Sequence, residues 1–134
     1  MMKKNTLLPL VILLLITSLM SCNGQQSENG SYTSIEASEF KDKVEASDVQ
    51  LVDVRTISEY QSGHLHGAVL ADYLGGQFTE YKTKLDKSKP VYVYCAVGGR
   101  SKRAALELEK EGFEVIELAG GITDWKAKGF DVEN

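Results

Sequence analysis

Short apolar runs alternate with helical patterns from Ser34 to Asp131, and this alternation restricts the fold more than any other feature of the sequence. The run "PVYVYC" (90–95) has the composition of a buried strand, with a proline at its first position, where a missing N–H is tolerated. "SKRAALELEKEG" (101–112) follows as a helix, with alanines and a leucine on one face and Gly112 as its left-handed C-cap. This alternation predicts βαβ units, and therefore an α/β domain with a parallel sheet covered by helices on both faces.

Other segments fit the same alternation. Strands are predicted in "VQLVDV" (49–54) and "FEVIELA" (113–119). Ser38 is expected to be the N-cap of a helix before the first of these strands. A second, short helix is expected to open at Thr56, because Glu59 stands three residues later, at capping-box spacing. A further apolar run, "AVLADY" (68–73), and helical patterns at 76–85 and 121–129 extend the alternation.

The first 21 residues are predicted to be a signal peptide that is removed from the mature protein. A basic start, "MMKKN", precedes an apolar run of 15 residues, which is shorter than the roughly 20 residues that span a bilayer. "LMSC" (19–22) resembles the lipobox of bacterial lipoproteins, so Cys22 is expected to carry lipid. The alternative is an ordinary signal peptide that leaves Cys22 as a spare thiol. We therefore expect an exported protein anchored to a bacterial membrane, on the periplasmic or outer-membrane side, with 22–33 as a flexible polar tether.

The net charge argues against one class of partner, and the number of cysteines points to a reactive thiol. The chain has a formal net charge of −4, and removal of the first 21 residues takes away two lysines and no acids. Such an acidic domain argues against a nucleic-acid partner, although Lys102 and Arg103 supply positive charge locally. If Cys22 carries lipid, Cys95 is the single remaining thiol in an oxidising compartment, which marks it as reactive. A disulfide between the two cysteines would tie the tether to the domain, and we do not expect it.

The stretch "YCAVGGRS" (94–101) joins the clearest strand to the clearest helix. Gly98 and Gly99 allow the backbone to curl so that several N–H groups point at one centre, beside the positive end of the helix. A Cys95 thiolate would be stabilised there, and Arg100 can hold an oxyanion through two hydrogen bonds. The alternative interpretation is a glycine-rich turn beside a small buried cysteine.

Three motifs in the chain together resemble the rhodanese-like family. "DVRTISEYQSGHLHGA" (53–68), "YCAVGGRS" (94–101) and "LAGGITDW" (118–125) match its signatures, and they occur in the family's order. The resemblance covers residues 34–131. It implies a single three-layer domain with a five-stranded parallel sheet flanked by helices, and a sulfurtransferase that carries sulfur as a persulfide.

The resemblance also assigns roles to residues of the 94–101 stretch. Cys95 matches the catalytic nucleophile, and the residues that match the substrate-binding loop are Ala96, Val97, Gly98, Gly99, Arg100 and Ser101. The reaction would move a sulfane sulfur from thiosulfate or a persulfide donor to cyanide, a thiol or a protein acceptor, without a cofactor, in a monomer. Members of the family often have a basic residue after the cysteine. Ala96 stands there in this chain, which leaves specificity for thiosulfate open.

The first motif contributes residues expected to support the site. Asp53 and Arg55 end a strand, and Arg55 is predicted to pair with Glu59 and brace the loop, with direct contact to substrate as the alternative. His64 and His66 do not make up a metal site by themselves, so His64 is interpreted as a structural turn residue and no metal is expected. Trp125, in the last motif, is predicted to lie in the core.

Two other functions remain as alternatives. A cysteine phosphatase or arsenate reductase would share the cysteine and arginine, but phosphatase loops have five residues between the two, whereas Cys95 and Arg100 are separated by four. The residue before the cysteine, often histidine in phosphatases, is Tyr94. The other alternative is a non-catalytic binding or regulatory module. Such modules typically lose the cysteine, and this chain retains it.

Overall fold

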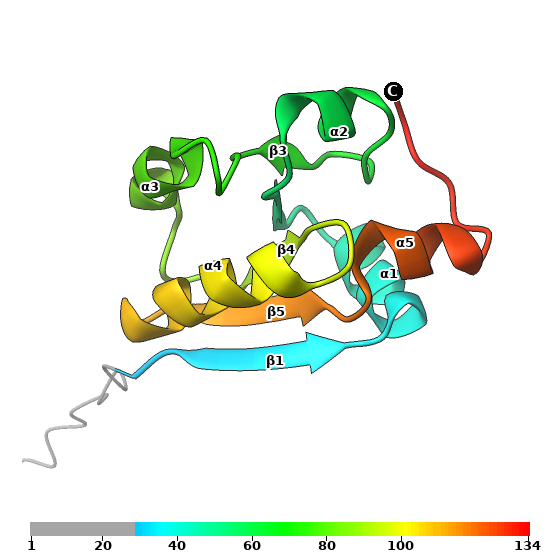
Figure 1. The fold of residues 1–134 in the computed structure, drawn as a ribbon. Helices are drawn as coiled ribbons and strands as arrows, with labels where there is room; N and C mark the ends of the chain where they lie inside the picture. The colour runs from blue at the N-terminus through cyan, green and yellow to red at the C-terminus, as the bar shows by residue number, and fades with distance from the viewer. Residues whose placement is uncertain (1–28) are drawn as a thin grey trace, which may run out of the picture.

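Residues 29–134 form one five-stranded sheet in which every paired strand runs parallel to its neighbour, in the order β1-β5-β4-β2-β3 (Figure 1). The computed structural model describes residues 29–134, so the predicted signal peptide and Cys22 lie outside the described residues. The elements are β1 (Ser31–Ile35), α1 (Ala37–Ala46), β2 (Gln50–Asp53), α2 (Ile57–Gln61), β3 (Val69–Leu70), α3 (Gln77–Tyr81), the 3₁₀ helix η1 (Lys82–Lys84), β4 (Val91–Tyr94), α4 (Gly99–Lys110), β5 (Glu114–Leu118) and α5 (Gly121–Ala127).

Helices cover both faces of this sheet, as the sequence predicted. Successive side chains of a strand point to opposite faces, and β4 shows this division. Val93 and the following Cys95 pack with buried residues of α3 and α4, whereas Tyr92 and Tyr94 pack with α1 and α5. Trp125 of α5 is buried on the second face, which confirms its predicted core position. Both faces of the central strand are therefore buried, and the Cys95 side chain lies on the α4 side.

Three element boundaries differ from the sequence-based predictions by two residues or more. β1 begins at Ser31 and pairs with β5, so the predicted tether is wrong over its last three residues. Helix α1 begins two residues earlier than expected, because Glu36 rather than Ser38 is its N-cap and accepts a hydrogen bond from the Glu39 N–H. Helix α4 begins at Gly99 instead of Ser101, which brings Arg100 into its first turn.

The carboxyl ends of the strands meet at one edge of the sheet. The loop after β4 lies there, and α5 begins against it (Figure 1). The C-terminal segment returns to the same part of the domain, because Glu133 forms a β-bridge with His64. Across residues 29–134, no helix combines the length and apolar character needed to cross a bilayer.

Candidate active site

Cys95 lies at the carboxyl end of β4 and is only 1% exposed. The chain then turns through Gly98, whose φ of +118° lies in the region that favours glycine, and α4 starts at the next residue. Only residues 95–98 separate the end of β4 from the start of α4. This geometry places the sulfur at the positive end of a twelve-residue helix, as predicted.

Hydrogen-bond donors of the loop surround the sulfur. The Gly98 N–H donates to Cys95 Sγ at 3.1 Å, and the thiol donates to Ser101 Oγ at 3.4 Å. Burial alone would raise the pKa of the Cys95 thiol, but hydrogen bonds from the Ser101 hydroxyl and from the N–H groups of Ser101, Gly98 and Val97 outweigh it. The pKa therefore lies below the ordinary value for a cysteine, so the loop favours the nucleophilic thiolate.

The loop is attached to the start of α5. The N–H groups of Ile122 and Thr123 donate to the carbonyl oxygens of Cys95 and Ala96, at 2.9 and 3.1 Å. Gly121 allows this contact, because a Cβ atom at that position would lie 2.5 Å from both carbonyl oxygens. The third motif therefore holds the Cys95 loop of the second motif in place. Neither motif indicates this contact by itself. Val97, in the same loop, is 67% exposed.

Arg100 points to α2 and pairs with Glu59. Its two terminal nitrogens donate to the two carboxylate oxygens at 2.7 and 2.9 Å. Glu59 also completes the predicted capping box with Thr56. The Arg100 guanidinium is the main cause that lowers the pKa of Glu59 to about 2. Arg100 was expected to bind an anion, but in this structure a carboxylate already occupies its two nitrogens.

The predicted ion pair between Arg55 and Glu59 is wrong. Arg55 donates to both carboxylate oxygens of Asp53, with its Nη2 2.7 Å from Oδ2, and both residues are buried. The Tyr94 hydroxyl donates to the same Asp53 oxygen at 2.6 Å, and the same Arg55 nitrogen donates to the Gly63 carbonyl at 2.7 Å. Burial first, and then the Asp53 charge, raise the pKa of Tyr94. Asp53 and Arg55 therefore brace the carboxyl end of β2 through their own buried pair, and not through the expected contact with Glu59.

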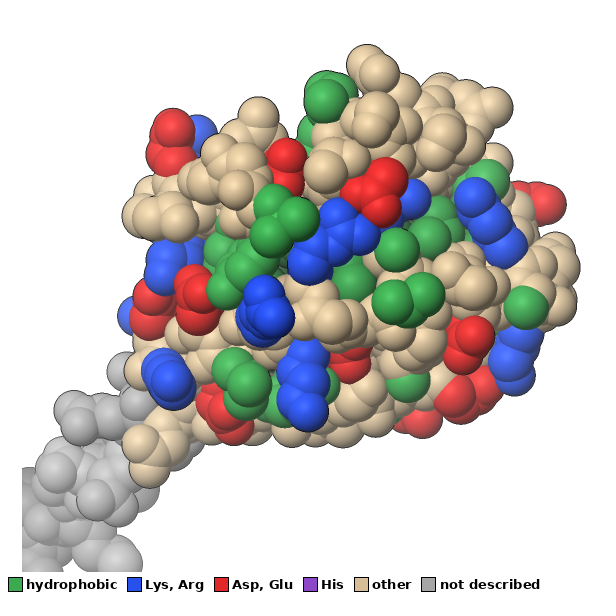
Figure 2. Space-filling model, in the orientation of Figure 1, with side chains coloured by type: hydrophobic (Ala, Val, Ile, Leu, Met, Phe, Trp, Pro, Cys, Tyr) green, Lys and Arg blue, Asp and Glu red, His purple; other side chains and the backbone are tan. Residues whose placement is uncertain are grey.

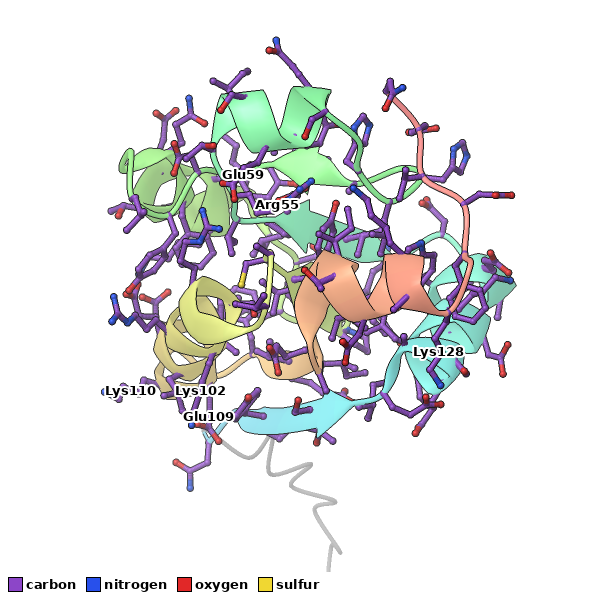
Figure 3. All side chains as sticks on the ribbon, turned by 45° about the vertical axis from the view of Figure 1, so that its right-hand side comes forward. Arg55, Glu59, Lys102, Glu109, Lys110 and Lys128 are labelled. Carbon is purple, nitrogen blue, oxygen red and sulfur yellow. The ribbon has the colours of Figure 1, made fainter. Side chains whose placement is uncertain are left out.

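The surface around the loop carries charges of both signs. Basic and acidic side chains adjoin between α2 and the start of α4, with hydrophobic side chains on either side (Figure 2). In Figure 3, Arg55 and Glu59 lie beneath α2, whereas Lys102 projects from α4 away from them. The predicted contribution of Lys102 to the site is therefore at most a long-range one.

The two histidines contact the C-terminal segment. His64 is buried and stacks on Tyr60, with 3.7 Å between ring centroids. Glu133 lies 3.3 Å from His64 Nε2 and 2.5 Å from His66 Nδ1. No group of three or more potential metal-binding side chains occurs among residues 29–134. This arrangement agrees with His64 as a structural residue.

Sequence reasoning missed Glu117, which lies behind the loop on β5. Glu117 is 3% exposed, and its Oε1 accepts a hydrogen bond from Ser101 Oγ at 2.8 Å. The available signal was strand alternation: Glu117 stands two residues after the buried Val115 and so points to the same face. An acidic residue on the inner face of a short apolar strand is uncommon and calls for a partner.

Comparison with known proteins places these motifs in one family. The family profile described as "Rhodanese-like domain" matches residues 36–128. The thiosulfate sulfurtransferase GlpE of Coxiella burnetii is 37% identical over 97 residues, which cover 72% of this chain and 89% of that protein. The putative sulfur carrier protein YrkF of Bacillus subtilis is 34% identical over 105 residues, which cover 76% of this chain but only 56% of YrkF.

A solved structure shows the same fold. The rhodanese-related protein of Thermoplasma volcanium superposes with a TM-score of 0.69 at 27% identity. The match covers 76% of this chain and 98% of that one.

Proposed function

The chain belongs to the rhodanese-like family, and from this premise we propose that it is a sulfurtransferase that carries sulfur as a persulfide on Cys95. The observation that carries the proposal is the Cys95 sulfur held at the start of α4, with its pKa lowered by hydrogen bonds from the loop. A buried structural cysteine would not need these donors. The similarity to GlpE supports a sulfane-sulfur donor such as thiosulfate.

The proposed reaction is a double displacement at sulfur. The Cys95 thiolate attacks the outer sulfur of thiosulfate, a new S–S bond forms, and sulfite leaves with the electron pair of the broken bond. The outer sulfur of the persulfide then carries the negative charge, beside the backbone N–H groups of the loop. Cyanide or a thiolate attacks that outer sulfur in the second step, and the Cys95 thiolate leaves. The two steps balance without an external oxidant or reductant.

Intact-mass measurement tests the proposal directly. The protein is incubated with thiosulfate and weighed before and after addition of cyanide. A single sulfur adduct that cyanide removes, and that is absent from Cys95→Ser, is the expected result. If neither thiosulfate nor a low-molecular-weight persulfide leaves an adduct on Cys95, the proposal fails and a binding module becomes the better interpretation.

A second candidate is a sulfur carrier that receives its sulfur from a persulfide rather than from thiosulfate. Two features favour it. Ala96 brings no charge next to the nucleophile, and the charge of Arg100 is neutralised by Glu59. A dianion such as thiosulfate gains little from such a site, whereas a persulfide donor needs less positive charge. The similarity to YrkF agrees with this candidate.

The rate of adduct formation separates the two candidates. Thiosulfate and glutathione persulfide are compared as donors at equal concentration, with formation of the Cys95 persulfide as the readout. A carrier reacts much faster with glutathione persulfide. Comparable rates, or a faster reaction with thiosulfate, support the thiosulfate sulfurtransferase instead.

We also propose, from residues 1–22, that the protein is exported and held at a bacterial membrane by lipid on Cys22. Labelling of cells with radioactive palmitate tests this proposal. Label on the wild-type protein that is lost in Cys22→Ala is expected. Equal label on both proteins, or label on neither, contradicts the anchor.

A further inference from the structure

Behind the loop, a buried carboxylate is held by hydroxyl groups. Glu117 Oε2 accepts hydrogen bonds from Ser34 Oγ at 2.6 Å and from the Tyr32 hydroxyl at 3.2 Å, both on β1. Its other oxygen accepts the Ser101 hydroxyl. Within the described part of the chain, no lysine or arginine forms an ion pair with Glu117. The side-chain partners of both Glu117 oxygens are therefore hydroxyl groups.

Ser101 is the link between Glu117 and the nucleophile. Its side chain is fully buried, and its oxygen lies within hydrogen-bond distance of Cys95 Sγ, the Gly98 carbonyl and Glu117 Oε1. A serine hydroxyl has one hydrogen to donate and two lone pairs that accept. The contact with Glu117, at 2.8 Å, is the shortest of the three. A hydrogen given to Glu117 is not available to the sulfur.

We propose that Glu117 is a positioning residue that draws the Ser101 hydroxyl hydrogen away from Cys95 and so limits how readily the thiol ionises in the free protein. In the thiol state, Cys95 donates to Ser101 Oγ and Ser101 donates to Glu117, so each polar group has a partner. In the thiolate state, the sulfur and the carboxylate compete for one hydrogen. The inference rests on the proposed function only in treating Cys95 as the nucleophile.

Other charged groups face the nucleophile from neighbouring elements. Arg100 of α4 is close enough to Cys95 to interact with its charge, and Glu59 of α2 neutralises part of that interaction. The Asp53–Arg55 pair lies internally beside the same strand ends. None of these groups contacts Ser101 Oγ, whereas Glu117 does. An effect of Glu117 on Cys95 that acts through the Ser101 hydroxyl can therefore be distinguished from the effect of these other charges.

The test is Glu117→Gln, with the ionisation of Cys95 as the readout. The pH dependence of alkylation by iodoacetamide is followed in the full chain by mass spectrometry of the peptide that carries Cys95, so Cys22 does not contribute. The amide is neutral and its N–H can donate to Ser101 Oγ, which frees the hydroxyl hydrogen for the sulfur. A hydrogen bond to a charged group is strong enough for about a tenfold rise in the thiolate-to-thiol ratio at a given pH.

Two further variants test whether the change in the Cys95 thiolate-to-thiol ratio has the expected sign and whether it is specific to Glu117. Ser34→Ala removes a donor from Glu117, so the carboxylate draws more strongly on Ser101, and the thiolate-to-thiol ratio should fall. This variant also tests the proposal if Glu117→Gln does not fold. Glu114→Gln makes the same chemical change at an exposed position of the same strand and should leave the ratio unchanged.

The route through Ser101 is tested by a double-mutant cycle. In the Ser101→Ala background, Glu117→Gln should have little effect, because the shared hydroxyl is gone. A full effect in that background would show that Glu117 acts by its charge alone, and would overturn the proposal. An unchanged or lower thiolate-to-thiol ratio in Glu117→Gln would overturn it as well. These readouts do not involve a sulfur donor, so they are independent of whether the protein transfers sulfur.

Discussion

Glu59→Gln should remove the ion pair with Arg100 while it leaves the capping box of α2 in place. Glutamine is as suitable as glutamate at this position of a capping box, so its side-chain oxygen can still accept from the Thr56 N–H. The variant therefore tests the charge of Glu59 separately from its role in the capping box. Glu59→Ala would remove the charge and the cap together.

The magnitude follows from the pKa of Glu59, which is lowered from 4.5 to about 2. Without screening, such a shift corresponds to roughly 3 kcal/mol of free energy of unfolding. The Glu59 side chain is 34% exposed, however, so solvent reduces the value to about 1 kcal/mol. Because the pKa is lower in the folded protein, this contribution is fully present above pH 4.5 and is lost as the pH falls towards 2.

Urea denaturation of the wild type and the variant between pH 7 and pH 2.5 measures this difference. We expect a constant gap of about 1 kcal/mol in the free energy of unfolding from pH 7 to pH 5, which then shrinks steadily as the pH falls. Glu80→Gln, at an exposed i,i+4 pair with Lys84, is the matched control and should change the free energy of unfolding by less than about 0.5 kcal/mol. A gap that does not shrink in acid would refute the assignment of Glu59 stability to its ionised form.

Three further predictions concern the loop and its support. Gly121→Ala should lower the free energy of unfolding by about 3 kcal/mol in urea denaturation, because its Cβ would clash with two backbone carbonyls of the Cys95 loop. Tyr94→Phe should lower it by about 2 kcal/mol by the same measurement, because Asp53 loses a buried donor. The alkylation rate of Cys95 should reach half its maximum at a lower pH than that of a cysteine in the urea-unfolded chain. Equal midpoints would contradict the lowered pKa.

The β4 strand and the position of Cys95 after it were predictable because their signals are local. A short apolar run marks the β4 strand, and Gly98 and Gly99 soon after Cys95 mark a sharp turn into a helix. Local signals also place the capping box of α2 correctly. The comparisons confirm the family that the three motifs together indicated. The strand, the turn and the capping box each depend on residues that are close in the sequence.

The partner of Arg55 was mispredicted because the i,i+4 rule was applied outside a helix. That rule describes neighbours on a helix surface, but α2 begins only at Ile57. Arg55 stands in a bend before the helix, where its side chain reaches back to Asp53. The Arg55 N–H also donates to the same carboxylate at 2.9 Å, which fixes this local geometry. Asp53, two residues before Arg55, was the better candidate for its partner.

Glu117 was missed because its partners come from distant parts of the chain. Ser34 stands opposite it in the register of β1 and β5, and Ser101 reaches it from α4. The prediction of a tether up to residue 33 also left part of β1 unassigned, although Tyr32 contributes a hydroxyl. A polar edge strand has no apolar run to reveal it. Only the paired sheet shows that its hydroxyl groups face an acid.

The side-chain donors of the loop are less available to an anion in the structure than the loop sequence suggests. Arg100 and Ser101 are the side-chain donors of the loop, and in the structure each already has a carboxylate partner, Glu59 and Glu117. When Ser101 donates to Glu117, the donors that remain for the sulfur are backbone N–H groups, among them that of Gly98. Such donors converge on one small anionic centre, so they favour a single charged sulfur over a group with several charged oxygens. Local acidic partners, rather than the net charge of the protein, therefore determine which anion this loop can hold.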